Sequence, residues 1–211
     1  MSYSMDLVDQ LQKLGKLLRK RNYTPGYSGN ISVRVGETIV ITASGVANGF
    51  LSDSSFVEMD FNGNPIDSQK KPSSEKMLHI AMYKNRPDVH CVIHVHSPAL
   101  SAFAAANKDL MEPVMIENVC YFGGIPLAEY ALPSSEDLVE KTSKYFKDYS
   151  VVLMKNHGVI VGGTCIKDAY LKLEMAEEYA KSIIYANVLG GVKPLSAEQV
   201  GELNELMKTN L

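Results

Sequence analysis

The sequence contains no tryptophan and only three cysteines in 211 residues. Cys91, Cys120 and Cys165 stand far apart and form no Cys-x-x-Cys pair, which argues against a disulfide framework. No apolar run approaches about 18 residues, so we expect no membrane span. The first ten residues, MSYSMDLVDQ, lack the apolar core of a secretory signal. These absences predict a cytoplasmic protein whose thiols stay reduced.

The chain also lacks a strong excess of either charge. Its 21 basic and 24 acidic side chains give a formal net charge of -3, which indicates neither a nucleic-acid partner nor an anionic membrane surface. Hydrophobic residues make up 45% and charged residues 21%, as in ordinary globular proteins. A chain of this length fits one domain over residues 1–211 and can bury roughly 70% of its unfolded surface.

Two kinds of hydrophobic periodicity alternate along the chain. Leucines at positions 7, 11, 14 and 18 predict an amphipathic helix over residues 6–21. Alternating apolar residues predict strands over 31–35 and 38–43, over the histidine-containing stretch 89–96, and on both sides of a turn at 155–158. Residues 113–132 read as irregular or extended. Further helices are expected within 70–88, 97–107, 135–148, 167–191 and 196–208. The pattern predicts an α/β domain with a mostly antiparallel sheet.

The stretch PDVHCVIHVHSPALSAF places three histidines on an otherwise apolar strand. Strand alternation puts His90, His94 and His96 on one face, with Ile93 and Val95 on the other. The Cβ atoms of His94 and His96 should lie about 7 Å apart, so both rings can reach one metal ion at ~2.0–2.1 Å. His90 lies about 13 Å from His94 and cannot share that ion. The alternative is two buried histidines that serve only as hydrogen-bonded core residues.

A metal site needs at least one further protein ligand, and the spacing leaves two candidates open. His157 lies in the turn KNHG between two apolar runs, and His79 lies on the helix that precedes the histidine strand. Glu75 shares a helix face with His79 because four residues separate them. Glu75 could be an ordinary first-turn acid, or it could be a metal ligand and general base.

Three loops rich in small polar residues complete the set of candidates. YSGN, TASG and PSSE lie where strands or helices are expected to end. Their backbone N–H groups and hydroxyls could bind an oxyanion, and the start of a helix favours negative charge. No GxxxxGK[ST] motif occurs, so a phosphorylated small molecule fits better than a nucleotide.

In order and separation, the motifs SGN, TASG, PSSE, HVHS and NHG resemble the class II aldolase/adducin family. The resemblance covers nearly the whole chain, from the first helix to Gly191. It implies a three-layer α/β/α fold with a mostly antiparallel central sheet. It also implies a homotetramer whose active sites lie between subunits.

The resemblance further implies the roles of individual residues. His94, His96 and His157 match the family's zinc ligands, although such a site can accept another divalent transition metal. Glu75 matches the catalytic acid/base, which also binds the metal in the empty enzyme. Tyr130 matches a catalytic tyrosine that reaches the adjacent subunit's site. The residues that match the substrate-phosphate pocket are Gly29, Asn30, Ser44, Gly45, Ser73 and Ser74.

The implied reaction is retro-aldol cleavage of a ketose 1-phosphate to dihydroxyacetone phosphate and an aldehyde. L-fuculose 1-phosphate and related deoxy or methylthio ketose phosphates are the expected substrates. Residues 196–211 contain no aromatic side chain, whereas fuculose-type enzymes carry one over the site, so the sugar could differ. The alternatives on this scaffold are L-ribulose-5-phosphate 4-epimerase, which has Asp in place of Glu75, methylthioribulose-1-phosphate dehydratase, and an adducin-like structural domain.

Overall fold

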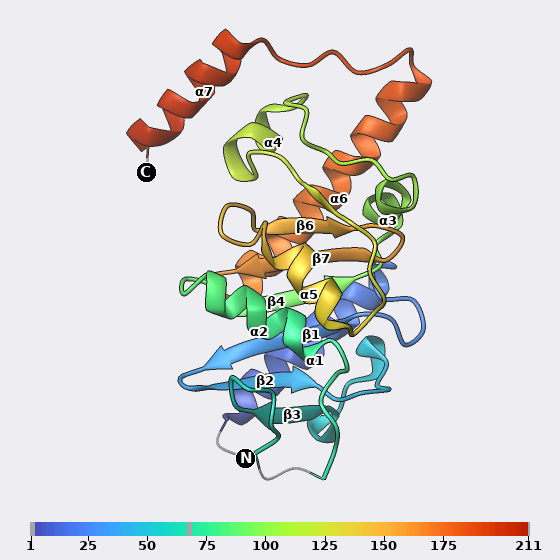
Figure 1. Cartoon of the computed structure of the whole chain (residues 1–211), viewed down its shortest axis with the longest axis vertical. Coiled ribbons are helices and arrows are strands. Elements are labelled where there is room, and N and C mark those ends of the chain that lie inside the picture. The colour runs from blue at the N-terminus through green and yellow to red at the C-terminus, as the bar shows by residue number, and fades with distance from the viewer. Residues whose placement is uncertain (1–2, 67–68, 211) are drawn as a thin grey trace.

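The central sheet of this α/β protein contains seven strands in a computed structural model that describes residues 3–66 and 69–210. Their order across the sheet is β3-β2-β1-β4-β7-β6-β5 (Figure 1). The two hairpins expected from the sequence are confirmed as β1–β2 and β6–β7. The strands are β1 (Asn30–Val35), β2 (Thr38–Thr42), β3 (Phe56–Met59), β4 (Cys91–Val95), β5 (Leu127–Ala128), β6 (Val151–Met154) and β7 (Gly158–Gly163).

We expected a mostly antiparallel sheet, but the sheet is mixed, because the pairing at one of its edges is parallel. Neighbouring strands from β3 across to β6 pair in antiparallel fashion, but β5 runs parallel to β6. β5 and β6 are joined by a crossover that contains α5 (Glu136–Ser143), and parallel strands require a crossover of this kind.

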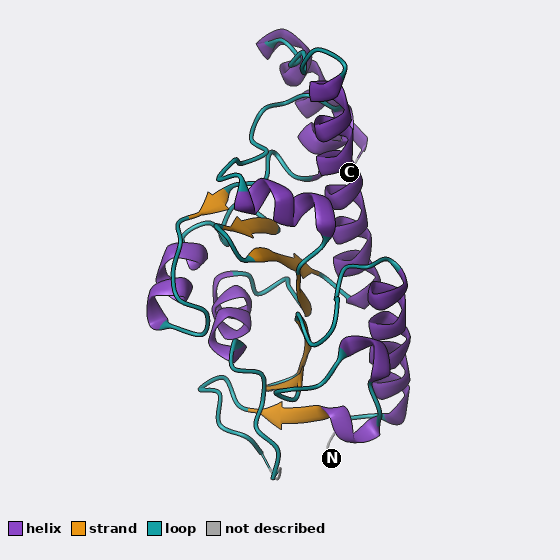
Figure 2. Ribbon diagram, turned by 90° about the vertical axis from the view of Figure 1, so that its right-hand side faces the viewer, coloured by secondary structure: helices purple, strands orange, loops and turns teal. Residues whose placement is uncertain are grey.

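Helices cover both faces of the sheet and form the expected α/β/α layers (Figure 2). One core packs α1 (Met5–Lys20), α3 (Pro98–Ala105) and α6 (Ile166–Val188) against one face. A second core packs α2 (Lys76–Asn85) and α5 against the other. Along β4, Ile93 lies in the first core and Val92 in the second. The alternation predicted for the histidine strand is thereby confirmed.

The ends of the helices follow the capping signals in the sequence. The Ser4 hydroxyl accepts the Leu7 N–H at the start of α1. α7 (Ala197–Asn210) begins with a capping box, in which Ser196 and Gln199 exchange side-chain and backbone hydrogen bonds. α6 ends before Gly190 and Gly191, whose φ angles are +113° and +108°.

The expectation for residues 113–132 was wrong in part, because α4 (Ile116–Tyr121) lies within them. A helix of six residues is too short to show a 3.6-residue period. Figure 1 shows α7 set away from the sheet and beside α4, beyond an extended segment that follows α6. Among the described helices, none is both long and apolar enough to cross a membrane.

Candidate metal centre

Three imidazoles meet where β4 ends beside the turn between β6 and β7. His94 lies within β4, His96 follows that strand directly, and His157 lies in the turn. β4 pairs with β7 so that Val95 lies opposite Val159, which brings the start of β7 next to the histidine pair. The ring centroids are 4.8 to 5.2 Å apart, and one ligating atom from each ring lies within 4.8 Å of the others.

The orientation of His94 is set by the backbone of β7. Its Nδ1 lies 2.9 Å from the carbonyl oxygen of Val159. A carbonyl oxygen can only accept, so Nδ1 carries the proton and Nε2 keeps its lone pair. Nε2 of His94 faces Nε2 of His96 at 3.2 Å. A backbone carbonyl that holds the outer nitrogen of an imidazole is typical of metal-ligating histidines.

Glu75, the residue immediately before α2, completes the centre. Its Oε2 lies 3.1 Å from Nε2 of His94, and its Oε1 lies 3.3 Å from Nε2 of His157. Oε1 is buried and accepts no hydrogen bond from the described residues. Ligands at ~2.0–2.1 Å from a tetrahedral ion lie about 3.3 Å apart, and these spacings match that value. The donor set therefore fits a divalent transition metal such as Zn²⁺.

The protonation states of the centre also fit a cation. Burial, followed by repulsion from His94, lowers the pKa of His157 to about 4, and burial with both neighbouring imidazoles lowers the pKa of His96 to about 4. Burial by itself would raise the pKa of Glu75. The nearby imidazoles of His94 and His157 and the hydrogen bond from Asn30 outweigh this effect of burial. Together they hold the pKa of Glu75 below its usual value. Neutral imidazoles and an ionised carboxylate are the forms that bind metals.

Two glycines allow the backbone to approach this centre. Gly29 has φ +76°, and a Cβ there would lie 2.5 Å from the carbonyl oxygen of His94. A Cβ at Gly158 would lie 2.5 Å from the Val95 oxygen and 2.7 Å from Cδ2 of His96. Gly158 is thus a site residue that the sequence reasoning missed, although the NHG motif contains it.

The centre forms part of the wall of a pocket of about 230 Å³. All six residues expected to bind phosphate line this pocket together with the three histidines and Glu75. Ser28 and Ser134 also line it and were not predicted. The hydroxyl of Ser28 is buried and has no hydrogen-bond partner among the described residues, so it is free to bind a ligand. None of the described lining residues is lysine or arginine.

The start of α2 is fixed against the end of β2. The Ser44 N–H bonds the carbonyl oxygen of Lys71, and the Ser73 N–H bonds that of Thr42. These two amides are therefore occupied, and the serine hydroxyls remain as donors toward a ligand. The pocket also receives the positive end of the α2 dipole, which favours an anion.

The other candidates from the sequence lie outside the centre. His79 is fully buried and bonds Asn30 and Ser32 instead of joining the three imidazoles. His90 is exposed and bonds the carbonyl oxygen of Asp88, and it lies outside the three-histidine group as its distance along the strand predicted. Tyr130 is 55% exposed and does not line the pocket of its own chain.

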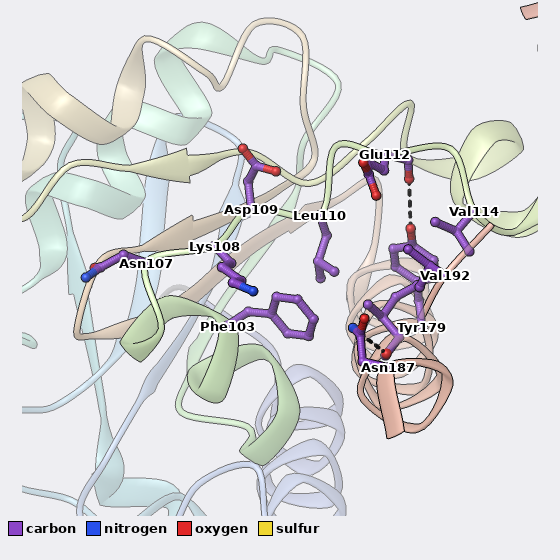
Figure 3. A pocket seen from close by; sticks show the side chains of 11 residues that line it. Phe103, Asn107, Lys108, Asp109, Leu110, Glu112, Val114, Tyr179, Asn187 and Val192 are labelled. Carbon is purple, nitrogen blue, oxygen red and sulfur yellow. Dashed lines mark hydrogen bonds between the residues drawn. The ribbon is translucent and has the colours of Figure 1, made fainter. Parts of the chain in front are cut away.

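Size alone does not identify the site. A larger pocket of about 420 Å³ lies between the end of α3, the loop at 107–114 and α6 (Figure 3). Figure 3 shows Phe103, Leu110 and Tyr179 along it, and its described lining residues include no histidine or cysteine. The smaller pocket combines donors for a metal with donors for an oxyanion, so we take it as the functional site.

Comparison with known proteins identifies relatives of this chain. The family described as "Class II Aldolase and Adducin N-terminal domain" matches residues 9–184. A protein of Methanocaldococcus jannaschii named L-fuculose phosphate aldolase is 38% identical over 172 residues, which cover 82% of this chain and 92% of that protein. A protein of Haemophilus influenzae named 3-oxo-tetronate 4-phosphate decarboxylase is 33% identical over 174 residues, which cover 80% of this chain and 82% of that protein.

The fold leads to the same group of proteins. A solved structure of an L-fuculose 1-phosphate aldolase superposes with a TM-score of 0.90 at 28% identity, and the match covers 98% of both chains. The likeness therefore includes the sheet, both helical layers and the segments that form the pocket.

Proposed function

The chain belongs to the class II aldolase and adducin family and is a lyase of the aldolase type, and from this premise we propose that it cleaves a ketose 1-phosphate to dihydroxyacetone phosphate and an aldehyde. The observation that carries the proposal is the shared pocket of the three imidazoles, Glu75 and the six predicted phosphate-binding residues. L-fuculose 1-phosphate and related deoxy or methylthio ketose phosphates are the substrates we propose.

The pocket walls would hold the substrate by its phosphate. Hydroxyls of Ser28, Ser44 and Ser73 lie at the ends of β2 and of the loops before β1 and α2. With no lysine or arginine among the described lining residues, hydroxyls, backbone N–H groups and the α2 dipole would carry most of the phosphate binding. This arrangement would leave the carbonyl and hydroxyl groups of the sugar facing the imidazoles.

We propose Zn²⁺ as the ion held by His94, His96, His157 and Glu75. When bound, such an ion supplies Lewis acidity to the oxygens of the substrate. The carbon–carbon bond between C3 and C4 breaks, its electron pair stays on C3, and the C4 hydroxyl proton passes to solvent by way of Tyr130 as the aldehyde C=O forms. The Glu75 carboxylate takes up one proton from solvent and delivers it to C3, which yields dihydroxyacetone phosphate. In the pocket this carboxylate contacts Asn30 and the imidazole nitrogens of His94 and His157.

Tyr130 is proposed to transfer a proton at the aldehyde oxygen in the site of an adjacent subunit. Its exposed side chain and its position outside the pocket of its own chain support a role toward a neighbour. The proposal requires a homotetramer in which each site takes Glu75 from one subunit and Tyr130 from the next.

A second activity is favoured by the relatives named 3-oxo-tetronate 4-phosphate decarboxylase. Loss of carbon dioxide from a 3-oxo acid also breaks a bond of the carbon next to a carbonyl group and leaves the electron pair on that carbon. Glu75 would then protonate that carbon in the same way. The same centre could serve either substrate class, and the released product distinguishes them.

The test is to assay the Zn²⁺-loaded protein against a panel of ketose 1-phosphates, L-ribulose 5-phosphate and 3-oxo-tetronate 4-phosphate. We expect release of dihydroxyacetone phosphate from a ketose 1-phosphate. Carbon dioxide release from the oxo acid would replace the aldolase proposal with the decarboxylase. An isomerised pentulose phosphate without a triose product would replace it with an epimerase. Protein that folds normally and binds no metal would refute both lyase proposals.

A further inference from the structure

A chain of buried hydrogen bonds runs from the metal centre into the second core. Asn30 donates from Nδ2 to Oε2 of Glu75 at 3.1 Å, and its Oδ1 faces Nε2 of His79. Nδ1 of His79 lies 2.7 Å from the hydroxyl of Ser32, which lies 2.7 Å from the hydroxyl of Tyr83. All of these side chains are buried, so water does not replace any of the bonds.

The direction of every bond follows from the carboxylate at one end. An ionised carboxylate only accepts, so Asn30 turns its NH₂ group to Glu75 and its carbonyl oxygen to His79. His79 must therefore carry its proton on Nε2, which leaves Nδ1 as an acceptor for the hydroxyl of Ser32. Ser32 then accepts from Tyr83. Burial lowers the pKa of His79 to about 3, so its ring is neutral and has one proton to place.

We propose that His79 is a positioning residue, which holds Asn30 so that its NH₂ group, rather than its carbonyl oxygen, faces Glu75. Without the Nε2–H group of His79, the Asn30 amide could rotate and present its oxygen to the carboxylate. Two acceptors would then oppose each other in a buried site, which costs free energy and displaces Glu75. Ser32 contributes by selecting the His79 tautomer, since its hydroxyl donates to Nδ1.

Sequence and register place these groups together. Asn30 lies opposite His94, and Ser32 lies opposite Val92, across the β1–β4 pairing. Both β1 side chains therefore lie on the same face of the sheet as His94. His79 and Tyr83 are four residues apart on α2, so they share the helix face that packs on that side.

The experiment compares His79→Leu with His79→Gln. The glutamine amide can donate to Asn30 from about the position of the imidazole Nε2–H, whereas leucine cannot. The buried Ser55, which accepts the Ser52 N–H outside the pocket, gives the matched control Ser55→Ala. Co²⁺ affinity, kcat and KM are measured for each variant, and NMR of ¹⁵N-histidine-labelled, metal-free protein reports the His79 tautomer.

We expect His79→Leu to lower kcat or Co²⁺ affinity about 10- to 100-fold, as changes to residues that orient metal ligands commonly do, with KM changed less than about threefold. His79→Gln should recover most of that loss, and Ser55→Ala should resemble the unaltered protein. NMR should show the proton of His79 on Nε2, and Ser32→Ala should shift it toward Nδ1. Equal losses in both His79 variants, or an Nδ1 proton in the unaltered protein, would overturn the proposal.

The kinetic part of this inference rests on the proposed role of Glu75 in catalysis. If the unaltered protein cleaves no substrate, the proposed function fails, whereas the tautomer and the Co²⁺ affinity still test the network. If His79→Leu does not fold, Ser32→Ala decides the question. In that case an unchanged His79 tautomer with unchanged Co²⁺ affinity would overturn the inference.

Discussion

The carboxylate of Glu177 on α6 accepts the backbone N–H of Leu100 on α3 at 3.0 Å. Its other oxygen accepts the N–H of Ala99 at 2.9 Å. These N–H groups lie at the start of α3 and have no acceptor within the helix, and the helix dipole there also favours a negative charge. α3 begins two residues after His96, so α6 fixes the chain where it leaves the metal centre.

Glu177→Ala should be strongly destabilising, because it leaves two buried N–H groups without acceptors. We expect the free energy of unfolding to fall by about 3 kcal/mol, from two charge-assisted hydrogen bonds. Urea denaturation measures the change. The exposed neighbour Glu178 gives the control Glu178→Ala, which should change stability by less than about 0.5 kcal/mol. Similar losses in both variants would contradict this role for Glu177.

Gly158→Ala should weaken the metal centre. Its methyl group would lie 2.7 Å from Cδ2 of His96, so the ring would have to move. We expect Zn²⁺ affinity to fall about 10-fold or more, measured by competition with a chelator. Gly201→Ala is the control, because a methyl group there meets nothing within 4 Å. Unchanged Zn²⁺ affinity in Gly158→Ala would show that the ring can adjust freely.

Glu75→Gln should keep most of the bound metal and lose most of the turnover. The amide preserves the size of the side chain but cannot deliver the proton to carbon. Turnover should fall about 10²- to 10⁴-fold, the usual contribution of a general acid/base. Metal content and kcat are measured on the same sample. Full turnover in Glu75→Gln would remove this residue from the proton-transfer step.

The metal-free protein should lose stability as the pH falls below 6.5. Its histidines at 79, 96 and 157 have folded-state pKa values of about 3, 4 and 4, below their ordinary value of 6.5. Between these values the unfolded chain binds protons that the folded chain does not, so acid favours unfolding. Each histidine can contribute up to about 1.4 kcal/mol per pH unit in this window. Urea denaturation at several pH values measures the slope, and a smaller slope is expected in His79→Gln.

Subunit mixing tests the assignment of Tyr130. Glu75→Gln and Tyr130→Phe should each be nearly inactive, because each lacks one proton-transferring group. Unfolding and refolding them together should restore sites that combine Glu75 of one subunit with Tyr130 of its neighbour. In a ring with random mixing, about one site in four would be intact. No recovered activity in mixed tetramers would mean that the two residues do not share a site across subunits.

The sequence by itself determined the local features of this protein. Hydrophobic periodicity located the main helices and strands, because packing against a core imposes the 2.0 and 3.6 periods. Strand geometry paired His94 with His96 and excluded His90. α4 was missed because its single short turn carries no period, and the parallel edge strand was missed because partner choice depends on distant residues.

Only the tertiary structure decided which further residues meet the histidine pair. His79 is nearer in sequence, but the β4–β7 register brings His157 to the centre and leaves His79 to hold Asn30. Glu75 reaches the same point because α2 packs on the face of β4 that carries His94. Spacing along a chain limits which neighbours can share an ion. Contacts between segments far apart in sequence depend on how the whole core packs.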